Sequence, residues 1–449
     1  METAKPKEHA LLVAVDAYRD AWAVTDSLEE LARLAETAGV SVVDAVTQKL
    51  SHPLTGTYVG KGKLEEIQNL REVLDYDLII FNDELSPSQQ RNLEKTLDIK
   101  IVDRTALILD VFARRAQTHE GRLQVELAQL EYRMPRLTGM WTHLSRQAQG
   151  GVGLRGPGET QLETDRREIG KRIAFIKTQL ADVHRHRELY RDNRRAQGIP
   201  VVALVGYTNA GKSTLLNSLT GAGVLAEDKL FATLDPTTRR IALPSGREVL
   251  LTDTVGFINN LPTQLIAAFR ATLEEISEAT VLIHVVDVTH PNAAEQVQTV
   301  ITTLEDLGAD DRQVVFALNK IDRFTDEELA SLPARAETIG APGDSVAISA
   351  RKGLHLDALL GRIEGVLEDE DSFVNVELAI PFNRSELVDR FHTYGRVEER
   401  DYNESGALLV GWLPEREIAR FDPFIRRVAN AEMEGASIVD NRHEATSAA

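Results

Sequence analysis

The chain has 449 residues, and at about 150 residues per domain this length predicts roughly three domains. Apolar residues make up 43% of it and charged residues 27%, which is typical of a globular protein and excludes a disordered one. The absence of cysteine excludes disulfides, a cysteine nucleophile and cysteine-ligated metal centres.

The chain carries 51 basic and 70 acidic residues, a net charge of -19, which argues against general affinity for nucleic acid. Any contact with RNA therefore requires a local basic surface. No apolar run is long enough to cross a bilayer, and residues 1–9 lack the basic-then-apolar pattern of a signal peptide. We expect a cytoplasmic protein, and we expect a monomer.

Strand and helix patterns alternate over residues 1–105. Asp26 is expected to cap the first helix, and Ser86 and Pro87 to open the last one. Strands are expected at 10–15, 40–46, 77–81 and 99–102, with a further helix at 63–74. Such alternation favours a parallel sheet wrapped by helices, so we predict an α/β domain over 1–105.

Residues 106–196 contain no strand pattern. Leucines and isoleucines recur at helical spacing on both sides of residues 149–158, which contain five glycines and a proline. We predict two long helices joined by a glycine-rich loop. Over 166–195 there are ten Lys and Arg against four acids, an excess of +6. This excess indicates an RNA partner, and the alternative is a solvated coiled-coil face.

A phosphate-binding loop follows the apolar run 199–205. Residues 206–213 read Gly-Tyr-Thr-Asn-Ala-Gly-Lys-Ser, a Gly-x4-Gly-Lys-Ser motif between a predicted strand and a predicted helix. Backbone N–H groups of such a loop converge on phosphate oxygens. We expect Lys212 to reach the β and γ phosphates and the Ser213 hydroxyl to bind Mg²⁺.

Three further motifs, each at a strand end, point to guanine. Asp253-Thr254-Val255-Gly256 supplies a carboxylate for water-mediated Mg²⁺ binding and a glycine N–H for the γ-phosphate. In Asn319-Lys320-Ile321-Asp322 the final carboxylate accepts two hydrogen bonds from a guanine edge. The backbone of Ser349-Ala350-Arg351 is expected to contact the guanine oxygen. Between the phosphate loop and Asp253 a switch threonine is required, and Thr233, Thr237 and Thr238 are all candidates.

We therefore predict a P-loop GTPase domain at 197–367. An acidic stretch at 368–371 is expected to be a linker. Beyond it, a strand at 374–380, a helix at 385–394, a hairpin at 396–412 and a helix at 414–428 predict a small α+β domain over 373–440.

The chain resembles the HflX GTPases. The GTPase motifs carry this resemblance together with Tyr58-Val59-Gly60-Lys61-Gly62-Lys63, Asp103-Arg104-Thr105, the stretch Leu123–Leu130 and Arg155-Gly156-Pro157-Gly158-Glu159-Thr160-Gln161-Leu162-Glu163. The match covers about residues 10–365. It implies a GTPase that binds the large ribosomal subunit, splits ribosomes under stress and contacts ribosomal RNA through the helical hairpin and its loop.

The resemblance also selects Thr233 as the Mg²⁺ threonine, beside Ser213. It thus gives Lys212, Thr233 and Gly256 as catalytic residues, and Mg²⁺ as the cofactor for the substrate GTP. The predicted nucleotide-binding residues are Gly206, Tyr207, Thr208, Asn209, Ala210, Gly211, Lys212, Ser213, Thr214, Phe231, Ala232, Thr233, Leu234, Asp235, Asp253, Thr254, Val255, Gly256, Asn319, Lys320, Ile321, Asp322, Ser349, Ala350 and Arg351.

Phe257 occupies the position where Ras-like enzymes carry a water-orienting glutamine. A phenyl ring cannot hydrogen-bond water, so we expect the isolated chain to hydrolyse GTP slowly, with hydrolysis timing release from the ribosome. The side chain is either a core aromatic or part of a gate. Family members are reported to bind ATP in the N-terminal domain, but this sequence shows no second phosphate loop.

Two other functions remain open. One is a GTP switch that recruits a protein or a membrane partner, with a peripheral position at the membrane. The other is an ATP-dependent RNA remodeller.

Overall fold

The computed structural model describes residues 7–17, 22–137, 161–196, 199–221, 230–231, 233–259, 262, 275–369, 373–403 and 406–429. By its internal contacts the chain divides into two compact units, Met1–Ile363 and Glu364–Ala449. The predicted glycine-rich loop at 149–158 and Ala232 lie outside the described residues. None of the described helices is long and apolar enough to cross a membrane.

The N-terminal part of the first unit is a parallel four-stranded sheet with strand order β2-β1-β3-β4. Its strands are β1 (His9–Ala17), β2 (Ser41–Leu50), β3 (Leu78–Phe81) and β4 (Lys100–Asp103), and its helices are α1 (Val24–Thr37), α2 (Lys61–Leu74) and α3 (Pro87–Leu97). Ser86 caps α3 and Pro87 lies in its first turn, as predicted, and Gln89 completes a capping box with Ser86. The prediction for Asp26 is wrong, because α1 begins two residues earlier and Asp26 lies in its first turn.

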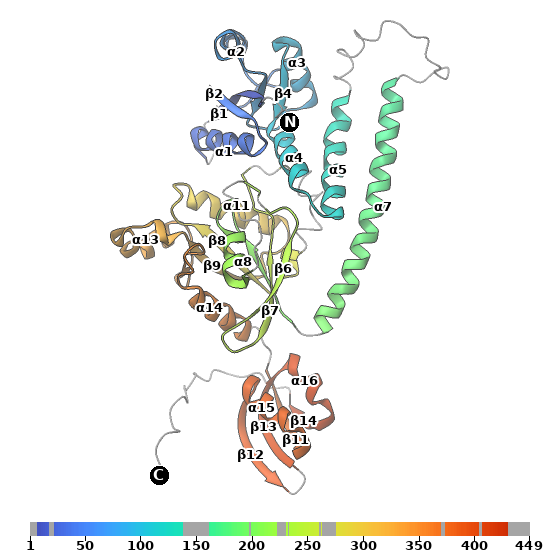
Figure 1. Ribbon diagram of the computed structural model, residues 1–449, viewed down its shortest axis with the longest axis vertical. Coiled ribbons are helices and arrows are strands. Elements are labelled where there is room, and N and C mark those ends of the chain that lie inside the picture. The colour runs from blue at the N-terminus through green and yellow to red at the C-terminus, as the bar shows by residue number, and fades with distance from the viewer. Residues whose placement is uncertain are drawn as a thin grey trace, which may run out of the picture. The chain divides into compact units, whose positions relative to one another are not determined.

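The helical region differs from the two predicted helices, because its first half is broken. It forms α4 (Arg104–Arg115), α5 (His119–Arg133), a short 3₁₀ helix (Met134–Arg136) and then α7 (Gln161–Ala196). The Thr118 hydroxyl accepts a hydrogen bond from the Gly121 N–H and starts α5 as a separate helix. Figure 1 shows α5 and α7 running beside one another, and we name this pair the helical arm.

Apolar contacts hold the helical arm together. Leu123 and Leu127 of α5 pack against Ile176 and Leu180 of α7. Ion pairs flank this seam, joining Arg172 to Glu126 at 2.7 Å, Lys177 to Glu131 at 2.8 Å and Arg187 to Glu120 at 2.7 Å. Part of the basic excess that the sequence assigns to an RNA partner is therefore neutralised within the arm by acids of α5.

The rest of the first unit is a six-stranded sheet of order β10-β9-β8-β5-β7-β6, parallel except for β6. Its strands are β5 (Val201–Val205), β6 (Thr237–Ala242), β7 (Glu248–Asp253), β8 (Val281–Asp287), β9 (Gln313–Asn319) and β10 (Val346–Ala347). Its helices are α8 (Lys212–Thr220), α11 (Ala293–Asp306), a 3₁₀ turn (Ile321–Arg323), α12 (Asp326–Ala330), α13 (Leu332–Thr338) and α14 (Leu356–Asp369). Parallel β5, β7, β8 and β9 bring the phosphate loop and two of the guanine-site motifs to one edge of the sheet.

The acidic stretch is not wholly a linker. Glu368 and Asp369 belong to the last turn of α14, whereas 370 and 371 lie outside the described residues. α14 continues past residue 367, the predicted end of the GTPase domain, and keeps an apolar face with Ile363 and Leu367 buried.

The second unit contains an antiparallel sheet of order β12-β13-β11-β14. It is formed by β11 (Phe373–Pro381), a 3₁₀ turn (Phe382–Arg384), α15 (Ser385–Tyr394), β12 (Arg396–Asn403), β13 (Gly406–Pro414), α16 (Glu415–Phe421), a 3₁₀ turn (Asp422–Phe424) and β14 (Ile425–Ala429). The predicted helix at 414–428 is wrong beyond Phe421. Pro423 lacks an N–H and disfavours continued helix, and the following segment pairs with β11 instead.

Candidate active site

The phosphate loop has the backbone that its glycines permit. Gly206 and Gly211 have φ of 147° and 106°, both in the region that favours glycine. A Cβ at Gly206 would lie 2.4 Å from the Val285 carbonyl oxygen, and one at Gly211 would lie 2.2 Å from the Asn319 side chain. Only glycine lets the loop close this tightly against β8 and β9.

Lys212 begins α8 and is buried beneath the loop. Its Nζ donates to the carbonyl oxygens of Gly206 at 3.0 Å and Tyr207 at 2.9 Å. Burial lowers the pKa of Lys212 to about 8, and the nearby Asp253 carboxylate opposes this shift. A phosphate placed against the ammonium would supply the negative charge that the buried lysine needs.

Three oxygen-bearing side chains meet beside Lys212. The Asp253 Oδ2 accepts hydrogen bonds from the Ser213 hydroxyl at 2.7 Å and from the Thr233 hydroxyl at 2.8 Å, and the two hydroxyls are 2.7 Å apart. The other candidates lie on β6, where the Thr238 hydroxyl bonds Thr252. The structure thus brings Thr233, rather than Thr237 or Thr238, to Ser213.

This cluster fits Mg²⁺. Hydroxyl and carboxylate oxygens are the hard ligands that the ion takes, and Asp253 Oδ1 is buried without a hydrogen-bond partner among the described residues. Burial raises the pKa of Asp253, against the lowering effect of Lys212 and the two hydroxyls. When bound, Mg²⁺ would neutralise phosphate charge, and Ser213 and Thr233 would hold it directly.

Asn319 ties the guanine-site segments to the phosphate loop. Its amide Nδ2 donates to the Ala210 carbonyl at 2.8 Å, and its Oδ1 accepts from the Ala350 N–H at 2.9 Å. The Lys320 ammonium bonds the Asn209 carbonyl at 2.8 Å and the Asp287 carboxylate at 2.6 Å. The Ser349 hydroxyl donates to Asp322 Oδ1 at 2.7 Å and so orients the carboxylate expected to read the base.

Gly256 lies against both the loop and the lysine. A Cβ there would be 2.9 Å from the Thr208 Cα and 3.0 Å from Lys212 Nζ, so a side chain would fill the space above the loop. Next to it, the Phe257 N–H donates to the Gly206 carbonyl, and the Thr208 N–H donates to the Phe257 carbonyl. The Phe257 ring itself is buried in the core cluster.

Two predicted nucleotide-binding side chains lie elsewhere. The Phe231 ring packs edge-on against Phe112 of α4, with the centroids 4.6 Å apart. The Asp235 carboxylate accepts hydrogen bonds from the backbone N–H groups of Gln117 at 2.8 Å and Thr118 at 3.0 Å, and from the Thr118 hydroxyl. These side chains join the segment around Thr233 to α4 and the start of α5 instead of facing the phosphate loop.

The structure also reveals a buried network that the sequence does not indicate. The Tyr207 hydroxyl donates to Glu30 of α1 and accepts from the Asn259 N–H at 2.7 Å. Glu30 also pairs with Arg104 of α4, whose guanidinium reaches the Asn259 carbonyl at 3.0 Å. Arg104 is 2% exposed and Glu30 8%. The N-terminal sheet domain is thereby bonded to the phosphate loop and to the segment after Gly256.

Comparison with known proteins assigns the same chemistry, GTP binding, to this chain. Family models match residues 25–113 (GTP-binding GTPase N-terminal), 115–194 (GTP-binding GTPase Middle Region) and 201–320 (50S ribosome-binding GTPase). With a Gly-x4-Gly-Lys-Ser loop and an Asn-Lys-Ile-Asp strand end at one sheet edge, the protein is a P-loop GTPase that hydrolyses GTP.

Individual relatives identify the family more narrowly. The chain is 48% identical over 405 residues to the GTPase HflX of Caldanaerobacter subterraneus, covering 90% of this chain and 91% of the relative. It is 51% identical over 361 residues to that of Alkalihalophilus pseudofirmus, covering 80% and 83%. It is 42% identical over 385 residues to that of Escherichia coli, covering 86% and 89%. The chain belongs to the HflX GTPases.

Nucleotide affinity should depend on the charge of Lys212. Because the pKa of the free protein's lysine is about 8 and bound phosphate raises it, binding above pH 8 requires proton uptake. We expect GDP affinity to be nearly flat from pH 6.5 to 7.5 and to fall by about fivefold between pH 8 and pH 9. Calorimetry in buffers of different ionisation enthalpy measures both quantities. Lys212→Ala should bind weakly with no such decline, and a flat wild-type profile to pH 9 would contradict the assignment.

The Asp322 carboxylate should determine base choice. Asp322→Asn replaces one acceptor with an amide donor that opposes the guanine amino group, whereas xanthine carries a carbonyl oxygen at that position. We expect GTP affinity to fall by about a hundredfold, the value of one or two charged hydrogen bonds, and xanthosine triphosphate to bind better than GTP. The exposed Asp326→Asn is the matched control. Retained preference for GTP in the Asp322 variant, measured by competition, would refute this role.

Proposed function

We propose that this protein binds the large subunit of cytoplasmic ribosomes in its GTP state, splits ribosomes under stress and leaves after hydrolysis. Membership of the HflX GTPases and the 50S ribosome-binding GTPase model over 201–320 support the target. The observation that carries the mechanism is the contact of Asp235 with the base of the helical arm, two residues from the Thr233 hydroxyl.

The switch segment links the nucleotide to the arm. Thr233 faces Ser213 and Asp253. The Asp235 carboxylate accepts hydrogen bonds from the N–H groups of Gln117 and Thr118, directly before α5. A carboxylate at this place stabilises a helix start by about 1 kcal/mol. A γ-phosphate that pulls Thr233 inward would shift Asp235 and change how α5 begins. GTP binding and hydrolysis would then alternate the arm between two arrangements.

The basic residues nearest to the predicted glycine-rich loop are the best candidates for RNA contact. Arg172, Lys177 and Arg187 pair with acids of α5, but Arg166 and Lys171 are exposed in the first turns of α7. Cations at this end could neutralise ribosomal RNA phosphates while the paired ones keep the arm straight.

GTP hydrolysis is expected to time the release of the protein from the ribosome. Phe257 places a buried ring where a water-orienting amide is needed, so the chain alone should leave its attacking water poorly oriented. We expect contact with the ribosome to supply or reorder that group, which would couple hydrolysis to a completed encounter.

Co-sedimentation tests the proposal. The full chain should pellet with large subunits in a non-hydrolysable GTP analogue and remain in the supernatant with GDP, and subunits should stimulate its GTP hydrolysis. Arg166→Glu with Lys171→Glu should weaken pelleting by about tenfold or more and leave GTP affinity unchanged.

The matched control reverses two exposed lysines of the N-terminal sheet domain, Lys49→Glu with Lys95→Glu, which change net charge by the same amount. Equal loss in both double variants would mean that total charge, not the arm, governs binding. Equal pelleting of the wild type with GDP and with the GTP analogue would contradict the switch itself.

Asp235 should couple the nucleotide to the arm. Asp235→Ala removes three hydrogen bonds at the start of α5 without touching the phosphate loop, so GTP affinity should stay within about twofold of wild type. The nucleotide dependence of ribosome pelleting should be lost. Asp110→Ala serves as control and should retain it, because Asp110 is an exposed acid of α4 that pairs with Arg114 of the same helix. If ribosome pelleting of the Asp235 variant still depended fully on the nucleotide, the coupling would be disproved.

A further inference from the structure

A cavity of about 640 Å³ is lined by residues of α1 and of the phosphate loop. Its volume lies in the range of ligand pockets, and its loop wall includes Thr208 and Asn209. Thr208 adjoins the groups expected around the terminal phosphate, since a Cβ on Gly256 would touch both the Thr208 Cα and Lys212 Nζ. The cavity therefore borders the loop at Thr208, a residue that also adjoins the groups expected around the γ-phosphate.

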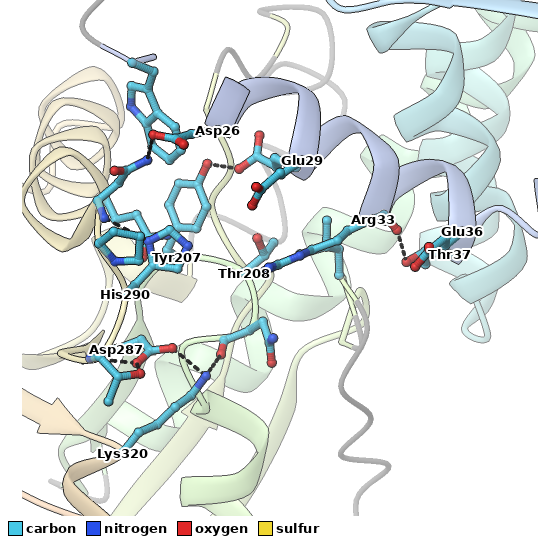
Figure 2. A pocket seen from close by; sticks show the side chains of 18 of the residues that line it. Asp26, Glu29, Arg33, Glu36, Thr37, Tyr207, Thr208, Asp287, His290 and Lys320 are labelled. Atoms are coloured by element: carbon cyan, nitrogen blue, oxygen red, sulfur yellow. Dashed lines mark hydrogen bonds and ion pairs between the residues drawn. The ribbon is translucent and has the colours of Figure 1, made fainter. Parts of the chain in front are cut away.

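Arg33 extends into this cavity from α1. Glu29 and Glu36 stand four residues before it and three after it, at spacings that normally give ion pairs on a helix. The Arg33 guanidinium nevertheless forms no hydrogen bond or ion pair within the described part of the chain, and in Figure 2 it points across the cavity toward Thr208. The Thr208 hydroxyl is itself buried with no partner among the described residues.

The helix that carries Arg33 is fixed to the loop. Glu30, one turn before Arg33, accepts hydrogen bonds from Tyr207 of the loop and from Arg104. Near the start of α1, Asp26 accepts a 2.7 Å hydrogen bond from Asn292, and the Trp22 ring stacks on Tyr207. These buried contacts hold the helix turn from which the exposed Arg33 side chain extends, and a rigid supporting element is what charge stabilisation in a transition state requires.

Arg33 is also the one basic residue in α1, whose other charged side chains on the cavity are acidic. Without it, this wall would repel a triphosphate. An unpaired guanidinium on an otherwise acidic wall, facing a phosphate loop, is most simply explained by a phosphate partner.

We propose that Arg33 is a catalytic residue of GTP hydrolysis, supplied by α1 to the γ-phosphate. Water attacks the γ-phosphorus, the bond from that phosphorus to the β–γ bridging oxygen breaks, and the electron pair stays on the β-phosphate. The protons of the water end on the released phosphate and in solvent. The Arg33 guanidinium donates hydrogen bonds to the phosphate oxygens, stays protonated and stabilises the charge that builds up there.

This role is separate from that of the residue missing at Phe257. Arginine stabilises phosphate charge, whereas an amide at position 257 would orient the water. Arg33 therefore accelerates a slow basal reaction and does not remove the need for a water-orienting group. The inference rests on the GTPase activity alone and not on the proposed ribosome role.

Single-turnover hydrolysis by the full chain, without ribosomes, tests the proposal. Arg33→Ala should lower the rate by at least about tenfold and weaken binding of GDP with aluminium fluoride, which mimics the transition state. GDP affinity and melting temperature should stay at wild-type values. Arg33→Lys should recover only part of the rate, because an ammonium cannot bond two oxygens in one plane.

Arg323→Ala is the matched control, since Arg323 is an exposed arginine that lines the same cavity from the GTPase side. It should keep the wild-type rate. A wild-type rate in Arg33→Ala, or equal losses in the two alanine variants, would overturn the proposal. So would a rate loss that is matched by the loss of GDP affinity or accompanied by a lower melting temperature, because Arg33 would then be a binding or structural residue.

Discussion

The short span from Thr233 to Asp235 is the constraint on which this structure depends. One hydroxyl is bonded to the Ser213–Asp253 pair, and one carboxylate two residues later is bonded to the N–H groups before α5. Two residues cover at most about 7 Å, so the chain has almost no slack with which to absorb a movement at either end. The GTPase site and the helical arm are in this way joined by one short segment, and this segment is the basis of the proposed coupling between them.

A second set of contacts joins the N-terminal sheet domain to the same site. Tyr207, inside the phosphate loop, shares Glu30 with Arg104, and both Tyr207 and Arg104 bond the backbone of Asn259. Buried charge of this kind adds little net stability, but breaking it by removing one partner leaves an uncompensated ion and costs several kcal/mol. The network consequently favours one placement of α1 over the phosphate loop, and with it one position for the backbone of Arg33.

Much of this molecule follows from local sequence patterns. The helix at 385–394, the helix start at Ser86 and the motifs of the GTPase sheet are each set by neighbouring residues, and the structure has them as predicted. The helix expected over 414–428 fails because a later segment finds a partner in β11, which no local pattern records. The basic residues of α7 that indicate an RNA surface in the sequence are in part neutralised by acids of α5. No local pattern records these tertiary partners either.

The candidate site likewise contains residues that local motifs predict and residues that only tertiary contacts bring together. The phosphate loop and the guanine-site segments can be located from short motifs. By contrast, Glu30 lies 74 residues from Arg104 and 177 from Tyr207, and Asp235 lies 117 residues from Thr118. Separations of this size carry no spacing signal, so the side chains that connect the nucleotide to the rest of the protein are visible only in three dimensions.

Hydrogen–deuterium exchange across residues 116–123 of the full chain tests the central claim most directly, because these N–H groups include the ones that Asp235 accepts from. The account predicts that a non-hydrolysable GTP analogue changes their protection relative to GDP, together with that of the facing segment of α7. Identical exchange in the two nucleotide states, with nucleotide bound in both, would contradict it.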